Sequence, residues 1–135
     1  EKVGVDEEVS SFVLPLGATI NMDGTGLYQG GAAVFIANAL GMDLNLGQQL
    51  TIVLTAALAS IGTAAVPGVG IVMLVIVLKA VDVPEAGIGL ILAVDRPLDM
   101  CRTVLNVTGD ATVATVVASS EGLIHKGERH HPTSP

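Results

Sequence analysis

The sequence has 135 residues, about the length of one domain, and half of them are hydrophobic whereas only 14% are charged and 2% are aromatic. Soluble domains usually carry about 25% charged residues, so this composition and the mean hydropathy of +0.68 favour a membrane protein. The net charge of −7 argues against nucleic-acid binding, and the single cysteine, Cys101, excludes a disulfide framework and a multi-cysteine zinc site.

The first nine residues, 1–9, are polar and are predicted to form a connector or a short surface helix. The opening letters EKVGVDEEVSS lack the basic and apolar regions of a signal peptide, and the first residue is not methionine. We therefore expect the sequence to be part of a longer protein.

The first apolar block, residues 10–41, is divided by the letters NMDGTG. Each half is too short to cross a bilayer, which takes about 20 apolar residues as a helix, but the two together are long enough. Gly24 and Gly26 are poor helix formers and favour a turn at this point. The block is therefore predicted to be a transmembrane helix broken near its middle.

The second apolar block, residues 44–81, is too long for one straight helix across a hydrocarbon core of about 30 Å. It is interrupted by SIGTAAVPGVG, which contains three glycines and Pro67. Non-helical backbone at membrane depth is tolerated only inside protein or at a cavity. The pattern predicts a re-entrant helical hairpin whose tip faces a binding site.

The third apolar block, residues 85–120, contains the charged stretch DRPLDMCRTVLNVTGD. In a helix, where each residue advances by about 100°, its polar side chains gather in an arc of roughly 100°. These residues are Asp95, Asp99, Arg102, Thr103, Asn106 and Asp110. Ionisable groups in a membrane segment normally face a cavity and mark a substrate or ion path. We predict a transmembrane helix with one polar stripe, kinked at Pro97 because proline removes a backbone hydrogen bond and clashes one turn back.

The chemistry of this stripe suits a zwitterionic ligand. Arg102 offers a planar fork of donors that matches a carboxylate, Asp99 can hold an ammonium group, and Asp110 can hold a small cation. A polar stripe is more often the solvated face of a soluble helix, but the flanking segments here are apolar all round.

Other site classes fit the sequence less well. The glycine-rich tip lacks the GK[ST] ending of a phosphate-binding loop, and DLNLG at residues 43–47 has its glycine misplaced for a calcium loop. No nucleophile and base stand in a recognisable arrangement, so we do not predict an enzyme.

Three stretches taken together resemble the C-terminal part of the glutamate transporter family, the sodium- or proton-coupled dicarboxylate and amino acid symporters. They are LPLGATINMDGTGLYQG, GQQLTIVLTAALASIGTAAVPGVG and LDMCRTVLNVTGD, in the order and at the spacing of the family. Broken helices and sites at the bilayer midplane are known features of this family.

The resemblance covers about residues 10–122 and implies an all-α membrane protein that holds a partial transport domain. The broken transmembrane helix is residues 10–41, the re-entrant hairpin 44–81 and the polar-striped transmembrane helix 85–120. The polar connector is residues 1–9 and the polar C-terminal tail is 123–135.

The resemblance also implies roles for matching residues. Arg102 would pair with the side-chain carboxylate of the substrate and Asp99 with its amino group. The other substrate-binding positions would be Asn106, Thr103, Thr25, Val66 and Gly70. Met22 would lie between the ion sites and the substrate.

The same resemblance implies three sodium sites. The first would comprise Asp110 with backbone carbonyls of Gly17, Asn21 and Asn106. The second would use Asp23 with Asn21. The third would be made by carbonyls of Thr19, Ser60, Ile61 and Thr63 when the hairpin closes.

The implied function is secondary active symport of glutamate or aspartate, driven by sodium and closed by the hairpin over a midplane site. The family implies a multi-pass protein of the cell membrane, a homotrimer at full length, with no organic cofactor and no nucleic-acid partner. Gln29 stands where potassium-coupled relatives have a glutamate, which argues against potassium counter-transport. The alternatives are proton coupling or a C4-dicarboxylate substrate within the same family. A different class of alternative is a soluble helical binding module or a non-functional helical fragment.

Overall fold

The computed structural model describes residues 4–62 and 68–124. Within these two ranges the chain is helical, and its one β contact is the isolated bridge between Val5 and Ile124. The helices are α1 (Glu7–Ile20), α2 (Asp23–Ala39), α3 (Leu46–Ile61), α4 (Val69–Lys79), the 3₁₀ helix η1 (Glu85–Ile88), α5 (Gly89–Leu92) and α6 (Asp95–Ser120). The predicted all-α class is confirmed over the described ranges. No helix in them combines the length and the hydropathy that a membrane crossing needs.

The predicted break in the first apolar block lies at Asn21 and Met22, between α1 and α2. The Asn21 backbone has φ −98° and ψ 86°, and its N–H still donates to the Gly17 carbonyl at 2.7 Å. The prediction that Gly24 and Gly26 form the turn is wrong, because both lie in the first turns of α2. Their small size serves packing instead: a Cβ at Gly24 would lie 2.7 Å from the Arg102 carbonyl oxygen.

The second block forms α3 and α4, which pack against each other and against α2. A capping box starts α3, in which the Asn45 side chain accepts from the Gln48 N–H while the Gln48 side chain accepts from the Asn45 N–H. The main apolar core joins α2, α3 and α4 with the segment that follows α4. Its fully buried large side chains are Ile36, Ile52, Leu74, Val77 and Leu78. Of the predicted hairpin tip, residues 60–70, the segment 63–67 lies outside the described ranges.

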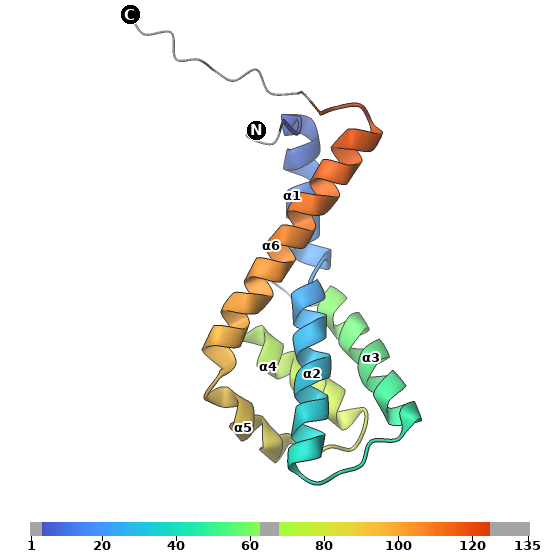
Figure 1. The fold of residues 1–135 in the computed structure, drawn as a ribbon, viewed down its shortest axis with the longest axis vertical. Coiled ribbons are helices and arrows are strands. Elements are labelled where there is room, and N and C mark those ends of the chain that lie inside the picture. Colours follow the sequence, from blue (N-terminus) through green and yellow to red (C-terminus); the bar gives the residue numbers. More distant parts are fainter. Residues whose placement is uncertain (1–3, 63–67, 125–135) are drawn as a thin grey trace, which may run out of the picture.

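The third block is divided, because the chain turns at Ala93 and Val94 between α5 and α6. Pro97 explains the turn: it has no N–H to donate to the Ala93 carbonyl, and its ring would clash with that carbonyl in a continuous helix. The structure therefore interrupts the predicted single helix one turn before the proline, and Pro97 itself lies in the first turn of α6. From there α6 extends past the start of α2 and continues alongside α1 (Figure 1), packing first on α2 and then on α1.

Candidate functional site

The polar stripe of α6 faces the break between α1 and α2. Arg102 and Asp110 are buried, Asp99 and Asn106 are partly buried, and Thr103 is exposed. The stripe therefore does not form a solvated face along most of its length. The Thr103 hydroxyl donates to the Asp99 carbonyl at 3.0 Å, within the helix.

Arg102 has the most restricted surroundings in the stripe, with a relative exposure of 6%. Its Nη2 pairs with the Asp99 carboxylate one turn back, and its guanidinium lies 4.4 Å from the centroid of the Tyr28 ring. The Nε and Nη1 atoms find no hydrogen-bond partner anywhere in residues 4–62 and 68–124. A buried donor without a partner is unfavourable, so Arg102 presents two donors suited to an anion.

The start of α4 closes one side of this arginine. Gly70 is buried, and a Cβ added there would overlap the guanidinium and lie 2.7 Å from its Cζ. The second arm of the predicted hairpin therefore touches Arg102 through backbone that carries no side chain. Val66, which was predicted to join Gly70 over the substrate, lies outside the described residues.

Asn106 connects α6 to the start of α2. Its Oδ1 accepts from the Gly24 N–H at 2.8 Å, and its Nδ2 contacts the Met22 sulfur at 3.2 Å and the Thr25 hydroxyl at 3.5 Å. The Thr25 hydroxyl also contacts the Met22 sulfur, at 3.8 Å. Since the first N–H groups of a helix have no partner inside it, Asn106 satisfies one of them from a distant part of the chain.

Asp110 lies one turn further along α6, beside α1. Its Oδ1 accepts from the Asn21 amide at 2.8 Å, and Gly17 approaches so closely that a Cβ there would lie 2.8 Å from the Asp110 Cγ. The structure thus brings together Asp110, Asn21 and Gly17, three of the four residues predicted for the first sodium site. Carboxylate and carbonyl oxygens are the ligands that hard cations prefer.

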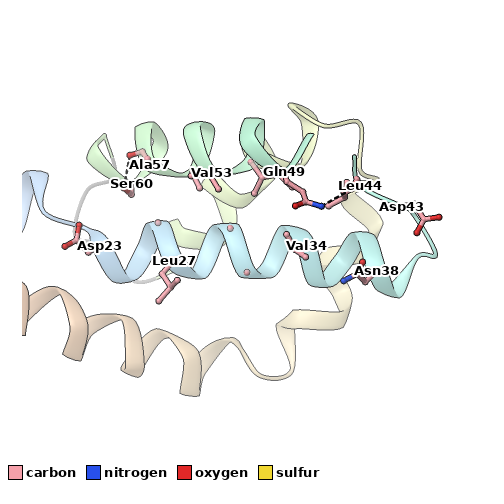
Figure 2. Close-up of a pocket in the computed structure, with 15 residues that line it drawn as sticks. Asp23, Leu27, Val34, Asn38, Asp43, Leu44, Gln49, Val53, Ala57 and Ser60 are labelled. Atoms are coloured by element: carbon pink, nitrogen blue, oxygen red, sulfur yellow. Dashed lines mark hydrogen bonds between the residues drawn. The ribbon is translucent and has the colours of Figure 1, made fainter. Parts of the chain in front are cut away.

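Asp23 was predicted to contribute, with Asn21, to a second sodium site. It is exposed and lines a groove of about 960 Å³ between α2 and α3. Figure 2 shows Asp23 and Ser60 near one end of this groove, and Asn38 and Asp43 near the other. Asn21 was predicted to contribute to both sites, its backbone carbonyl to the first, and in the structure its side-chain amide donates to Asp110.

Two of the four residues predicted for the third sodium site, Thr19 and Ser60, use their hydroxyls within their own helices. Thr19 donates to the Pro15 carbonyl at 3.0 Å, and Ser60 donates to the Ala57 carbonyl at 2.8 Å. Ile61 is exposed at the end of α3, and Thr63 lies outside the described residues. This site stays a prediction.

The model of one protein family, the Sodium:dicarboxylate symporter family, matches residues 1–120. The chain belongs to this family.

Among curated members of the symporter family, the chain is 55% identical over 117 residues to an excitatory amino acid transporter of Onchocerca volvulus, covering 87% of this chain and 24% of that protein. It is 58% identical over 111 residues to excitatory amino acid transporter 3 of Mus musculus, covering 82% of this chain and 21% of the relative. It is 54% identical over 117 residues to excitatory amino acid transporter 1 of Rattus norvegicus, covering 87% of this chain and 22% of that relative. The chain thus spans less than a quarter of the length of these relatives.

Two residues of this family member were missed as parts of the site. Tyr28 donates its hydroxyl to the Asp95 carboxylate at 3.0 Å, and its ring faces Arg102. Asp95 stood in the predicted stripe as a residue that would pair with Arg96 or with a part of the protein outside this sequence, and Tyr28 is the one tyrosine of the sequence, one turn after Thr25. Helical spacing could have placed Tyr28 near Thr25, but no local pattern pairs it with a residue of α6.

Proposed function

We propose that this chain forms the substrate- and ion-binding core of a sodium-coupled symporter for acidic amino acids. The observation that carries the proposal is the buried Arg102, which pairs with Asp99 and retains two donors without a partner in the described residues. Family membership and the names of the relatives support the same conclusion. At full length, the family resemblance supports a multi-pass homotrimer of the cell membrane.

The proposed substrate carries a group of opposite charge for each member of the Asp99–Arg102 pair. In the described structure Asp99 and Arg102 neutralise each other. A bound glutamate or aspartate would place its side-chain carboxylate on Arg102 and its ammonium on Asp99, which replaces one ion pair by two. Asn106, Thr25 and Thr103 would orient the substrate, and the hairpin, with Val66 and Gly70, would close over it.

Sodium would act as the co-transported substrate. One ion would lie at Asp110 with carbonyls of Gly17, Asn21 and Asn106, and another at Asp23 with Asn21. The third would take the carbonyls of Thr19, Ser60, Ile61 and Thr63. The buried Met22 contacts Asn106 through its sulfur, a place from which it can transmit the state of the ion sites to the substrate. A ligand shifts a conformational equilibrium only if it binds one state better, so sodium would favour closure only if the closed hairpin binds it more tightly.

The test is the affinity of the full-length protein for aspartate, measured by calorimetry with sodium and with choline in its place. We expect affinity to fall at least tenfold without sodium. Equal affinities in the two media would refute sodium coupling, and dependence on pH instead of sodium would establish the proton-coupled alternative.

A competition experiment addresses the dicarboxylate alternative. Succinate lacks the ammonium group that Asp99 would hold, so aspartate should displace radiolabelled aspartate at a much lower concentration than succinate does. Stronger displacement by succinate would assign the site to C4-dicarboxylates.

A further inference from the structure

We infer that a backbone bridge between the segment before α1 and the segment after α6 positions α1 on α6, and thereby sets the affinity of the proposed sodium site at Asp110. The bridge comprises Val5, Asp6, Leu123 and Ile124. The inference rests on the proposed function, since the α1 side of that site supplies part of the proposed ion ligands. The bridge residues would not contact sodium. They act through α1.

The bridge is a short antiparallel β contact. Val5 pairs with Ile124, and the Asp6 N–H donates to the Leu123 carbonyl at 3.2 Å. In an antiparallel pair, a hydrogen bond in this flanking place belongs to two opposed residues that share none of their own, whose Cα atoms lie about 4.5 Å apart. Figure 1 shows the start of α1 and the end of α6 at the same end of the molecule. The bridge fastens the two helices together there.

The end of α6 directs the chain back toward α1. Gly122 has a φ of +71°, in the left-handed region that favours glycine. Its N–H donates to the Ser119 carbonyl at 3.3 Å. The Leu123 N–H donates to the Ala118 carbonyl at 2.8 Å, and these two bonds form the Schellman pattern of a helix end. The reversal at Gly122 brings the Leu123 carbonyl to the Asp6 N–H.

Within the described ranges, α1 is held mainly at its two ends. It packs chiefly on α6, and Val9 is its one buried residue. A helix that buries so little apolar surface is weakly fixed by packing. At its far end, the Asn21 amide donates to Asp110 Oδ1 at 2.8 Å, and Gly17 lies against the same carboxylate. The position of α1 is therefore set by the contacts at Asp110 and by the bridge.

The proposed sodium ion would bind across the contact between these two helices. Gly17 and Asn21 lie on the α1 side, and Asp110 lies on α6. An ion that binds across a contact favours the state in which the contact is formed. Such coupling is reciprocal, so the bridge should tighten sodium binding and sodium should stabilise the bridge. A role in folding stability alone predicts neither effect.

Asp6 supplies a variant that removes the donor of the bridge. Its φ is −61°, which suits proline, and Val5 lies in a β contact, the conformation that suits the residue before a proline. Asp6→Pro deletes the N–H that donates to Leu123, together with the carboxylate that accepts from the Glu8 N–H. Asp6→Ala is the matched control, because it removes the same carboxylate and keeps the N–H.

The measurement is the sodium concentration that gives half-maximal aspartate uptake (the sodium requirement), for the full-length protein in proteoliposomes. We expect Asp6→Pro to raise the sodium requirement about threefold to tenfold, as the loss of one backbone hydrogen bond predicts. Asp6→Ala should match the unsubstituted protein. At saturating sodium, the KM for aspartate should be the same in both variants, because the bound ion then holds α1 in place. Equal sodium requirements in the two variants would overturn the inference.

A disulfide across the bridge provides a rescue. Opposed residues of an antiparallel pair lie within the Cα separation that a disulfide spans. The rescue variant combines Val5→Cys and Ile124→Cys with Asp6→Pro, and Cys101→Ser removes the one cysteine of the sequence. Oxidation with copper phenanthroline should restore the low sodium requirement, and reduction with dithiothreitol should raise it again. Variants with only one of the two new cysteines should not respond. An oxidised double variant that keeps the high requirement would contradict the inference.

The same double-cysteine variant tests reciprocity. The disulfide should form faster in sodium than in choline, because bound sodium favours the formed bridge. The same rate in both media would refute coupling between the bridge and the ion.

Asp110→Ala separates this inference from the proposed function, which requires this variant to raise the sodium requirement more than Asp6→Pro does. If Asp110→Ala leaves the sodium requirement unchanged, the proposed sodium site itself fails. If Asp110→Ala raises it but Asp6→Pro matches Asp6→Ala, only the positioning role of the bridge is refuted.

Discussion

At the scale of single residues, the contacts of Asn106 explain why an amide suits that position. Its oxygen accepts from the Gly24 N–H at the start of α2, while its nitrogen faces the Met22 sulfur and the Thr25 hydroxyl. An amide supplies an acceptor and donors at once, whereas a carboxylate supplies acceptors only and a leucine supplies neither. Asn106 thus connects α6 to the start of α2 through one side chain.

Replacing Asn106 with alanine should lower the free energy of unfolding by about 1–3 kcal/mol, because the buried Gly24 N–H loses its acceptor. Asn106→Asp keeps that acceptor and adds a negative charge at a helix N-terminus, which is favourable, so it should be the milder change. The measurement is the midpoint of thermal unfolding in detergent for both variants. A larger loss in Asn106→Asp than in Asn106→Ala would contradict this account of the residue.

Gly17 has no side chain, and this allows the Asp110 carboxylate to lie against its backbone. A Cβ at this position would overlap the Asp110 carboxylate. Gly17→Ala should therefore displace the Asp110 carboxylate from Asn21 and from the proposed sodium site. We expect the sodium concentration that gives half-maximal aspartate uptake to rise about tenfold. Gly31→Ala is the control, because a Cβ there meets no atom within 4 Å. The same sodium dependence in both variants would argue against an ion at Asp110.

At the scale of helices, the described elements agree with the sequence pattern where the cause is local. The 100° spacing predicted that Arg102, Asn106 and Asp110 share a face, and the three lie on one side of α6 toward α2 and α1. Pro97 predicted the interruption before α6 because its effect on a helix reaches only one turn back.

The sequence could not predict features that depend on a distant partner. The glycines after Asp23 favour a turn by local propensity, yet Gly24 lies in a helix because the backbone of Arg102 passes beside it. Tyr28 and Asp95 are separated by 67 positions, and no periodicity relates them. Tertiary packing decided both cases, and neither neighbour is visible in a local window.

The start of α4 carries a prediction of its own. Gly70→Ala should push the Arg102 guanidinium away from α4 or hold the hairpin off the site, because the added Cβ would overlap it. Aspartate affinity measured by calorimetry should fall at least tenfold. Gly62→Ala at the end of α3 provides the control, since its Cβ meets nothing within 4 Å and its φ of −89° suits alanine. Comparable affinities in the two variants would show that α4 does not confine Arg102.

At the scale of the whole molecule, α1 and the second half of α6 form an arm that extends from the helices around the core (Figure 1). The arm carries many large apolar side chains on its surface. One of them is Phe12, which has a relative exposure of 70%. Others on the arm are Leu16, Ile20, Val107, Val113 and Val116. Monomeric soluble proteins rarely expose large contiguous apolar patches, so we expect lipid or other protein surfaces to cover this arm.

Membrane retention of the 135-residue chain follows from that surface. After expression with an epitope tag, we expect the chain to stay in the membrane pellet after a carbonate wash and to float with lipid on a sucrose gradient. Flotation distinguishes membrane binding from aggregation, because aggregates also pellet but do not float. The matched variant replaces Phe12, Val107 and Val116 with lysine, which introduces charges that are unfavourable in hydrocarbon, and it should lose flotation. An unsubstituted chain in the carbonate supernatant would contradict the membrane assignment, because the apolar arm would then be stable in water without lipid.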